Sequence, residues 1–297
     1  MSGTLTLVGL PGALSGLVWE RACSAVATHA SPIGPPVWLA PGTACDWPVT
    51  AVDEAALRLA LDPIHTDCAF HHDGEQRRKA VLIADMDSTM VQGETLDELA
   101  GEAGIKDRIA AITIRAMRGE LDFADALAER VAALEGLEAA ALERTLTRTR
   151  NMPGAEALVA TMQAHGAVCW LVSGGFTAFT GPVAKRLGFS FNQGNTLELA
   201  DGRLTGRVIP PILDRDAKLA ALRNLANEAG VGLEAAVAVG DGANDLAMIQ
   251  AAGMGVAFQA KPAVCKAARF QVNHAYLRAL LYFQGYRAAE IEAAARH

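Results

Sequence analysis

The stretch VLIADMDSTMVQGE, residues 81–94, joins a short apolar run to two aspartates, Asp85 and Asp87. The run at residues 81–84 is typical of a strand that is buried on both faces of a parallel sheet. Because unpaired charge is costly inside such a core, carboxylates at the end of the strand are expected to face water, a metal or a ligand. The stretch therefore predicts a functional site at the carboxyl end of a buried strand.

Three further apolar runs end in small or polar residues. They are AVCWLVSGG (residues 167–175), AAVAVGDGAND (235–245) and GMGVAF (253–258), with helical patterns between them. Strands that alternate with helices favour a parallel sheet, in which ligands bind outside the carboxyl ends of the strands. One piece departs from the alternation: NTLELADGRLTGRV (195–208) predicts a β-hairpin beside the sheet, with its turn at Asp201-Gly202. The fold class is α/β.

The acidic residues at these strand ends suit phosphoryl transfer, which needs a nucleophile, a proton donor and positive charge on the phosphate. Asp85 is the candidate nucleophile, and Asp87 is the candidate acid and base. Two carboxylates so close together repel unless a cation lies between them, and an oxygen-liganded cation that binds phosphate fits Mg²⁺. We expect Asp85 and Asp241 to bind the metal directly, Asp87 through its backbone carbonyl, and Asp245 from behind them.

Neutral and basic residues in the same motifs are candidates for holding the substrate. The hydroxyl of Ser173 and the amides around Gly174 and Gly175 can donate to phosphate oxygens, and Lys218 can neutralise phosphate charge. Asn244 is a further candidate substrate-binding residue. Each motif alone also has an ordinary interpretation, as a solvated turn, a tight strand-to-helix turn or a surface lysine. The ordered set at successive strand ends favours the catalytic interpretation.

Together these motifs resemble the haloacid dehalogenase (HAD) superfamily of aspartate-nucleophile phosphatases, and within it the phosphoserine phosphatases. The resemblance covers residues 81 to about 270 and rests on DMDST (85–89), VSGGF (172–176), Lys218 and GDGANDLAM (240–248). It implies a Rossmann-like core with a parallel sheet (residues 77–94 and 151–297) and a helical cap (95–150) inserted after the first core strand. A small N-terminal α/β domain (1–76) precedes the core. The implied reaction is Mg²⁺-dependent hydrolysis of O-phosphoserine through an aspartyl phosphate.

The resemblance also implies roles for residues around the cap. Glu94 would contact the substrate ammonium, Arg130 its carboxylate, and Met117 and Phe123 would close over it. A carboxylate and a guanidinium suit a zwitterionic substrate. Other interpretations stay open: a first-turn helix carboxylate for Glu94, a solvated charge for Arg130, and cap core for Met117 and Phe123. Asn195 stands at the start of the hairpin segment that the family shares.

Composition excludes several classes of protein. The net charge of −7 and a pI near 5.5 oppose non-specific binding to nucleic acid, which needs a basic surface. No apolar run approaches the roughly 18 residues that a membrane span needs. Five scattered cysteines in no C-x-x-C arrangement predict reduced thiols rather than disulfides or a zinc site. With no secretory leader in the pattern, we expect a cytoplasmic protein.

The first 76 residues predict a small α/β module. Strands are expected at residues 4–9 and 35–42 and helices at 13–28 and 51–61, and the polar segment HHDGEQRRK (71–79) is the candidate linker to the core. The module resembles the ACT-like regulatory domains of longer family members. Three roles stay open: binding of serine, pairing of chains into a homodimer, and packing on the core.

Two alternative functions follow from the same motifs. One is a related phosphatase or phosphotransferase that acts on another small phosphorylated amino acid, because Glu94 and Arg130 do not fix the chain length of the substrate. The other is a signalling receiver, in which an aspartate stores phosphate as a switch. A receiver needs no helical cap, and Asp87 would hasten the loss of its signal, so the enzyme is the preferred interpretation.

Overall fold

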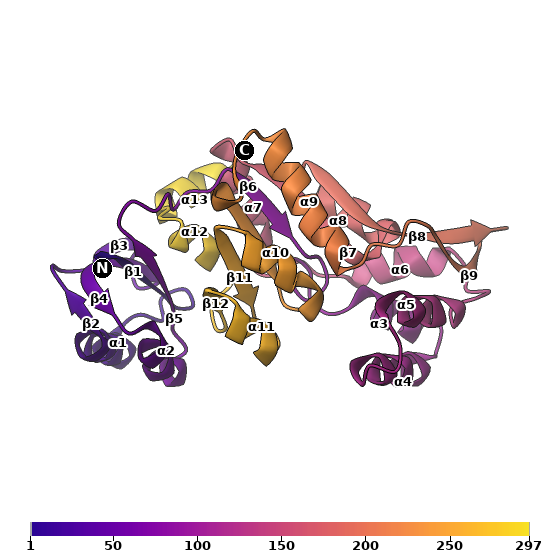
Figure 1. Ribbon diagram of the computed structural model, residues 1–297, viewed down its shortest axis with the longest axis horizontal. Coiled ribbons are helices and arrows are strands. Elements are labelled where there is room, and N and C mark those ends of the chain that lie inside the picture. Colours follow the sequence, from indigo (N-terminus) through magenta and orange to yellow (C-terminus); the bar gives the residue numbers. More distant parts are fainter. Residues whose placement is uncertain (1, 297) are drawn as a thin grey trace.

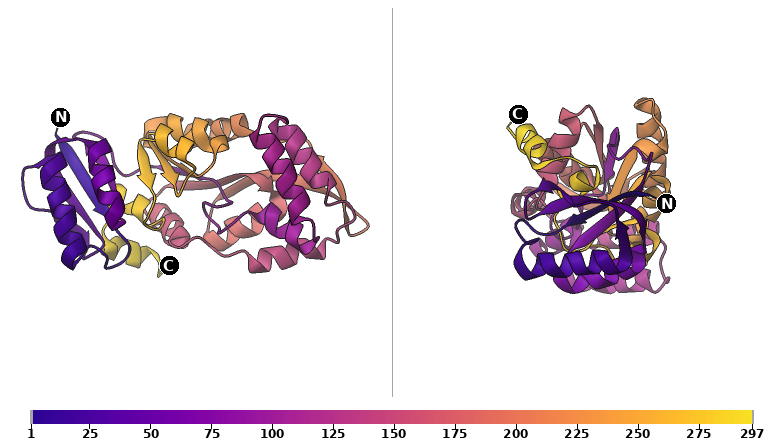
Figure 2. Two further views of the ribbon diagram at one scale, coloured as in Figure 1. Left: turned by 90° about the horizontal axis from the view of Figure 1, so that it is seen from below. Right: turned by 90° about the vertical axis from the view of Figure 1, so that its left-hand side faces the viewer.

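The chain forms three parts that follow one another along its longest axis: a small N-terminal sheet with two helices, a larger central sheet, and a group of helices at the opposite end (Figures 1 and 2). The computed structural model describes residues 2–296, apart from the side chains of Met117 and Arg215. Among the described helices, none is both long enough and apolar enough to cross a membrane. The five cysteines are free.

The central sheet has seven strands in the order β12-β11-β10-β6-β7-β8-β9. The strands are β6 (Val81–Ala84), β7 (Val168–Phe176), β8 (Phe191–Ala200), β9 (Arg203–Ile209), β10 (Ala236–Gly240), β11 (Met254–Phe258) and β12 (Phe270–Val272). All neighbours pair in parallel except β8 and β9. From β6 the chain moves outward to β7 and β8, then returns to place β10 on the other side of β6. This change of direction leaves a crevice at the carboxyl end of β6, where ligands bind in such sheets.

Helices cover both faces of the central sheet, which confirms the predicted α/β class. Successive residues of β6 point to opposite faces: Val81 and Ile83 pack with Leu222 of α9, whereas Leu82 belongs to the core on the other side. The first face carries α9 (Arg215–Glu228), α10 (Leu246–Ala251) and α11 (Pro262–Ala267). The second carries α7 (Ala155–Ala164), α8 (Thr177–Leu187), α12 (Ala279–Phe283) and α13 (Ala288–Ala294). Burial on both faces explains why β6 and β10 are continuously apolar.

The hairpin predicted from residues 195–208 is present but is part of the sheet rather than beside it. Asp201 and Gly202, both with positive φ, form the turn that brings Ala200 opposite Arg203. The prediction missed the first half of β8, which pairs in parallel with β7 through residues such as Phe191. One long strand therefore serves both the sheet and the hairpin.

Residues 95–148 form the four helices α3 (Thr95–Glu102), α4 (Lys106–Met117), α5 (Phe123–Ala132) and α6 (Ala140–Arg148), which confirms their predicted helical character. Asp122 caps α5, since its carboxylate accepts a hydrogen bond from the amide of Asp125 at 2.8 Å. Leu127 and Val131 of α5 reach the main core, and the helix lies against β9 of the hairpin. This group of helices is held against the carboxyl edge of the sheet, beside the crevice.

The N-terminal sheet is antiparallel and has more strands than the sequence predicted. It contains β1 (Gly3–Val8), β2 (Ala30–Pro32), β3 (Val37–Ala40), β4 (Ala44–Val52) and β5 (Asp67–His72), in the order β2-β4-β1-β5 with β3 also paired to β4. Helices α1 (Gly16–His29) and α2 (Glu54–Leu61) cover one face. The prediction missed β2, β4 and β5, and the first two residues of the predicted linker belong to β5. Pro48 within β4 and the polar ends of β5 obscure the strand pattern.

Polar groups join the N-terminal sheet to the central part. The buried carboxylate of Asp67 in β5 accepts hydrogen bonds from three successive backbone amides, at residues 273–275, over 2.8–3.1 Å. Arg77 donates to Asp46 and Thr6 of the N-terminal sheet and to the carbonyls of Tyr282 and Phe283 in α12. The segment 71–79 is therefore fixed between the two parts at Arg77 and is not a free linker.

Candidate active site

A cavity of about 630 Å³ lies where β6, β7 and β10 end, with α4 and α5 on its opposite side. Ten of the residues singled out in the sequence line it: Asp85, Asp87, Glu94, Phe123, Arg130, Ser173, Gly174, Gly175, Asp241 and Asn244. Lys218 and Asp245 are buried beneath it, in contact with Asp85 or with each other. The side chain of Met117 lies outside the described part of the chain, so its predicted role is not examined by the structure.

Asp85 is the first residue after β6, and it is 5% exposed. Its amide donates to the carbonyl of Val239 in β10 at 3.0 Å, so the strand pairing continues up to the carboxylate and fixes its position. Oδ1 accepts a hydrogen bond from the amide of Met86 at 2.8 Å and lies 2.7 Å from Nζ of Lys218. The contacts that Asp85 makes with described residues fall on Oδ1, which leaves Oδ2 for a substrate or a metal.

Lys218 reaches the site from the first turn of α9, whose start is fixed by Asp214 as N-cap. Its Nζ lies 2.7 Å from Asp85 and 2.6 Å from Oδ1 of Asp245. Burial lowers the pKa of Lys218, but the two carboxylates outweigh burial and raise it, so the ammonium stays charged. Burial in turn raises the pKa of Asp245, whose Oδ2 accepts from the amide of Gly242 at 3.0 Å. Both oxygens of Asp245 therefore already have partners.

Asp87 differs from Asp85 in having no cation against it among the side chains that the structure describes. Its Oδ1 accepts a hydrogen bond from the amide of Thr95 at the start of α3, at 2.9 Å. Burial and the nearby charge of Glu94 raise the pKa of Asp87 to about 8. A Cβ atom on Gly175 would lie 2.9 Å from Oδ2 of Asp87, so a larger residue there would displace this carboxyl from its place beside the tip of β7. Near neutral pH, Asp87 is therefore a carboxyl able to donate a proton.

Asp85, Asp241 and Asp245 form a cluster in which one oxygen from each lies within 4.8 Å of the others. Burial and the charge of Asp85 raise the pKa of Asp241 to about 6, and its Oδ1 accepts a hydrogen bond from Thr89 at 3.3 Å. An all-oxygen donor set with excess negative charge fits a hard divalent cation, because such ions bind carboxylates and retain water. The donors present therefore suit Mg²⁺.

The tip of β7 presents a polar pocket for an anion. Ser173 is 2% exposed, and its Oγ accepts a hydrogen bond from the amide of Gly175 at 2.9 Å. The fully buried Asn195 donates to the carbonyl of Gly174 at 2.8 Å and accepts from the amide of Leu213 at 2.8 Å. Asn195 thereby ties the glycine tip to the segment that leads into α9 and Lys218. Sequence reasoning placed Asn195 only at the start of the hairpin, because this link joins segments far apart in the chain.

Glu94 and Arg130 enter the cavity from the side of the cap helices. Glu94 is the N-cap residue of α3 but makes no capping hydrogen bond; its carboxylate accepts from the hydroxyl of Ser88 at 2.7 Å. Arg130 is half-buried in the cavity wall, and its Nε donates to the carbonyl of Ala126 at 3.1 Å. Burial lowers the pKa of Arg130, against the charges of Asp97 and Glu94. Its position in the cavity wall disfavours the interpretation of Arg130 as a solvated charge on a helix face.

Phe123 satisfies both interpretations that the sequence left open. Its ring packs partly against the main core, as a cap-core residue would. The same ring lies 3.3 Å from where a Cβ on Gly174 would stand, so it also covers the tip of β7 across the cavity. A larger residue at position 174 would push this ring away from the strand end.

Two charged residues of the cavity, Asp122 and Lys261, were missed by the sequence reasoning. Lys261, which precedes α11, lines the cavity beside Asp241: its amide donates to the carbonyl of Asp241 at 3.1 Å, and its charge lowers the pKa of that carboxyl, opposing the effect of burial. A single lysine before a proline carries no sequence signal for a site. Only the pairing of β10 with β11 brings it there.

Comparisons with known proteins agree with this geometry. Residues 82–250 match the family model of the haloacid dehalogenase-like hydrolases. One relative, phosphoserine phosphatase SerB2 of Mycobacterium tuberculosis, is 42% identical over 98% of this chain and 73% of its own length. A probable phosphoserine phosphatase from Vibrio cholerae, solved without ligand, has a TM-score of 0.80 and 30% identity, covering 98% of this chain and 88% of the other. A phosphoserine phosphatase solved as a phospho-aspartyl intermediate analogue has a TM-score of 0.65 and 37% identity, covering 69% and 99%.

Proposed function

The chain belongs to the haloacid dehalogenase-like hydrolase family, and on this premise we propose that it hydrolyses O-phospho-L-serine to L-serine and phosphate. The observation that carries the proposal is the position of Asp85, held at the end of β6 between the buried Lys218 and a cavity that also holds Asp87, Glu94 and Arg130. This is an arrangement for phosphoryl transfer to a carboxylate from a substrate that is also a zwitterion. It places the protein at the last step of serine synthesis.

Asp85 acts as the nucleophile. Lys218 orients the carboxylate through Oδ1, so Oδ2 can attack phosphorus and form an aspartyl phosphate. Asp87, which is protonated near neutral pH, donates its proton to the serine oxygen as the P–O bond breaks. The resulting carboxylate then takes a proton from water, which attacks the phosphoryl group and releases Asp85.

The phosphate is held by the tip of β7 and by a divalent metal. Ser173 and the amides around Gly174 and Gly175 are suited to bind its oxygens. Asp85 and Asp241 would hold Mg²⁺ directly with the backbone carbonyl of Asp87, while Asp245, whose oxygens are taken by Lys218 and Gly242, supports them. When bound, the ion supplies positive charge to the transferring phosphoryl group.

The amino-acid part of the substrate is recognised from the cap side. Glu94 suits the ammonium group and Arg130 the carboxylate, which a guanidinium can bind through two parallel hydrogen bonds. Phe123 lies over the same space, and Asn244 lines it from the turn that follows β10. Closure of the cap helices would exclude bulk water while the aspartyl phosphate forms.

The test is phosphate release from a panel that contains O-phospho-L-serine, phosphothreonine, phosphohomoserine and a sugar phosphate, with Mg²⁺ and with a chelator. We expect a strong preference for phosphoserine that disappears with the chelator. Metal-dependent turnover that favours another phosphorylated amino acid would keep the chemistry and overturn the substrate. No turnover of any phosphate ester by folded protein with Mg²⁺ would overturn the function itself.

Two further statements are predictions from the sequence. A cytoplasmic location follows from its composition, and pairing of chains through residues 1–76 is one of the roles open to the N-terminal module. Size-exclusion chromatography with light scattering, on the full chain and on a chain lacking residues 1–76, tests the pairing.

A further inference from the structure

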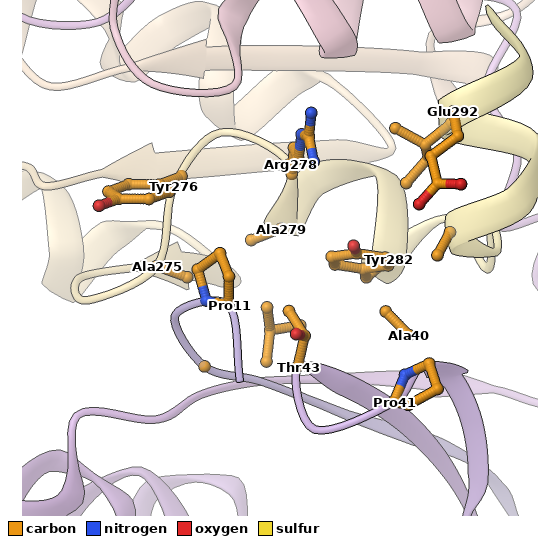
Figure 3. A pocket seen from close by; sticks show the side chains of 14 residues that line it. Pro11, Ala40, Pro41, Thr43, Ala275, Tyr276, Arg278, Ala279, Tyr282 and Glu292 are labelled. Carbon is orange, nitrogen blue, oxygen red and sulfur yellow. The ribbon is translucent and has the colours of Figure 1, made fainter. Parts of the chain in front are cut away.

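A second cavity, of about 250 Å³, lies at the junction of the N-terminal sheet with α12 and α13 (Figure 3). It is separate from the reaction cavity, with which it shares no lining residue. The loops after β1 and β3 form one side, and residues 275–292 form the other. Small-molecule sites occur preferentially at such boundaries between structural units.

The side formed by the N-terminal sheet is mainly apolar. Pro11, Ala40 and Pro41 lie along it with Val8, and Ala279 faces them from α12 (Figure 3). Prolines and alanines have little side-chain freedom to lose, so an apolar group placed between them is bound at little cost in entropy. This half of the cavity suits a short branched or ring-shaped hydrocarbon group.

The opposite side carries four polar side chains, Tyr276, Arg278, Tyr282 and Glu292 (Figure 3). Tyr282 is 5% exposed, and its hydroxyl, which points into the cavity, makes no hydrogen bond to the part of the chain that the structure describes. The side chains of Arg278 and Glu292 are exposed, and within that same part of the chain they make no ion pair or hydrogen bond. Burial raises the pKa of Tyr282, so the phenol is a neutral donor near pH 7. The hydroxyl therefore faces the open space of the cavity and is available to donate to a ligand there.

The walls are held in place by buried polar contacts. Asp67 fixes residues 273–275 through three hydrogen bonds, directly before the cavity-lining Tyr276. Arg77 bonds to the carbonyl of Tyr282 and to the carboxylate of Asp46, which spans the junction. The cavity is therefore formed before any ligand arrives, which lowers the ordering cost of binding.

We propose that this junction cavity binds a small zwitterion with an apolar side chain, an α-amino acid of about the size of leucine. Its carboxylate pairs with Arg278, its ammonium with Glu292, and the hydroxyl of Tyr282 donates to the carboxylate. The side chain lies between Pro11, Ala40 and Ala279. The volume excludes a nucleotide or other large cofactor, since pockets for drug-sized ligands span roughly 300–1,000 Å³.

The test is isothermal titration of the full chain with L-leucine, L-serine, 4-methylpentanoate and 3-methylbutylamine. The last two probes lack the ammonium and the carboxylate of leucine respectively. We expect L-leucine to bind at least about tenfold more tightly than the other three probes, because each of them lacks one of the groups that the cavity complements. Failure of L-leucine to bind to folded protein at millimolar concentration would overturn the proposal.

Variants separate this cavity from the rest of the surface. Arg278→Gln and Glu292→Gln should each weaken leucine binding about tenfold, and Tyr282→Phe about three- to tenfold. Arg21→Gln and Glu20→Gln, exposed on α1 outside the cavity, are the matched controls and should leave binding unchanged. Ala288→Phe should fill the cavity and abolish binding, with folding checked by circular dichroism.

Binding at the reaction cavity is the competing explanation. Arg130→Ala should leave leucine binding intact, since Arg130 lines only the reaction cavity. Loss of leucine binding in Arg130→Ala, or its persistence in all four cavity variants, would overturn the proposal. Neither result depends on which phosphate ester the protein hydrolyses, so the proposed function stands or falls separately.

Discussion

Acidification should weaken the folded chain through one residue, His71, which is buried where β5 meets β12. Its ring stacks on Phe270 with centroids 4.9 Å apart, and both ring nitrogens are buried without hydrogen-bond partners among described residues. Burial lowers the pKa of His71 to about 3, and the charges of Arg77, Arg269, Lys79 and His72 act in the same direction. The folded chain therefore keeps this imidazole neutral over a pH range in which an unfolded chain would protonate it.

The direction and the size of this change in the free energy of unfolding follow from proton linkage. Below the unfolded pKa of about 6.5 the unfolded state binds a proton that the folded state does not, so the free energy of unfolding falls as pH falls, until about pH 3. Each pH unit in this window costs about 1.4 kcal/mol, so a change from pH 7 to pH 5 should cost about 2 kcal/mol through His71 alone. His71→Phe keeps a ring against Phe270 and removes the titration. The variant should therefore lose about 2 kcal/mol less stability than the natural chain over this pH change.

Urea unfolding followed by tryptophan fluorescence measures this difference. Three of the four tryptophans, Trp19, Trp38 and Trp47, form one aromatic cluster in the N-terminal part, so the signal reports the unit that contains His71. Phe70→Leu, at the neighbouring position of β5, is the control: it should lower stability by the same amount at both pH values. Equal loss of stability on acidification in the natural chain and in His71→Phe would refute the reasoning.

Three further predictions concern the reaction cavity. Asp85→Asn should abolish phosphate release, and near-normal turnover in a coupled phosphate assay would contradict the mechanism. Arg130→Ala should raise KM for phosphoserine about 10- to 100-fold and leave a generic aryl phosphate unaffected, with Arg108→Ala on α4 as control; equal losses on both substrates would count against the carboxylate role. Lys218→Met should lower the free energy of unfolding without metal by about 3–5 kcal/mol, because it leaves Asp85 and Asp245 buried without their cation, and adding Asp245→Asn should recover part of that loss in urea unfolding. An unchanged urea midpoint for Lys218→Met would show that the buried charges are compensated otherwise.

Much of the reaction cavity was predictable because a parallel sheet brings the residues that follow each strand to the same edge. Each of DMDST, VSGGF and GDGAND follows an apolar strand, and the carboxyl ends of neighbouring parallel strands meet at one edge of the sheet. Lys218 was found through its position in the motif order, and the structure brings it within 2.7 Å of Asp85. The pattern alone did not reveal that Lys218 lies beneath the cavity rather than in its wall.

What escaped prediction depends on contacts between distant segments. The role of Asn195 requires β8, the tip of β7 and the segment before α9 to be folded together. Lys261 becomes a cavity residue only through the order of β10 and β11. In the N-terminal part, β5 reads poorly as a strand because Asp67 and His71 are polar, yet both are buried against the central part. These two polar side chains contact the central part of the molecule, and the local sequence around β5 gives no sign of those contacts.

Charge balance supports the proposal that Asp87 handles the proton in the reaction. The cluster of Asp85, Asp241 and Asp245 has the ammonium of Lys218 against it, and a divalent cation bound there would add further positive charge. An ionised Asp87 would add a negative charge beside a substrate phosphate, and like charges that lie close together disfavour ionisation. The raised pKa of Asp87, about 8, fits this balance, because a neutral Asp87 adds no repulsion and can donate a hydrogen bond to the leaving oxygen. Gly175, at the tip of β7, leaves space for the carboxyl of Asp87. The small residue and the carboxyl beside it therefore depend on each other.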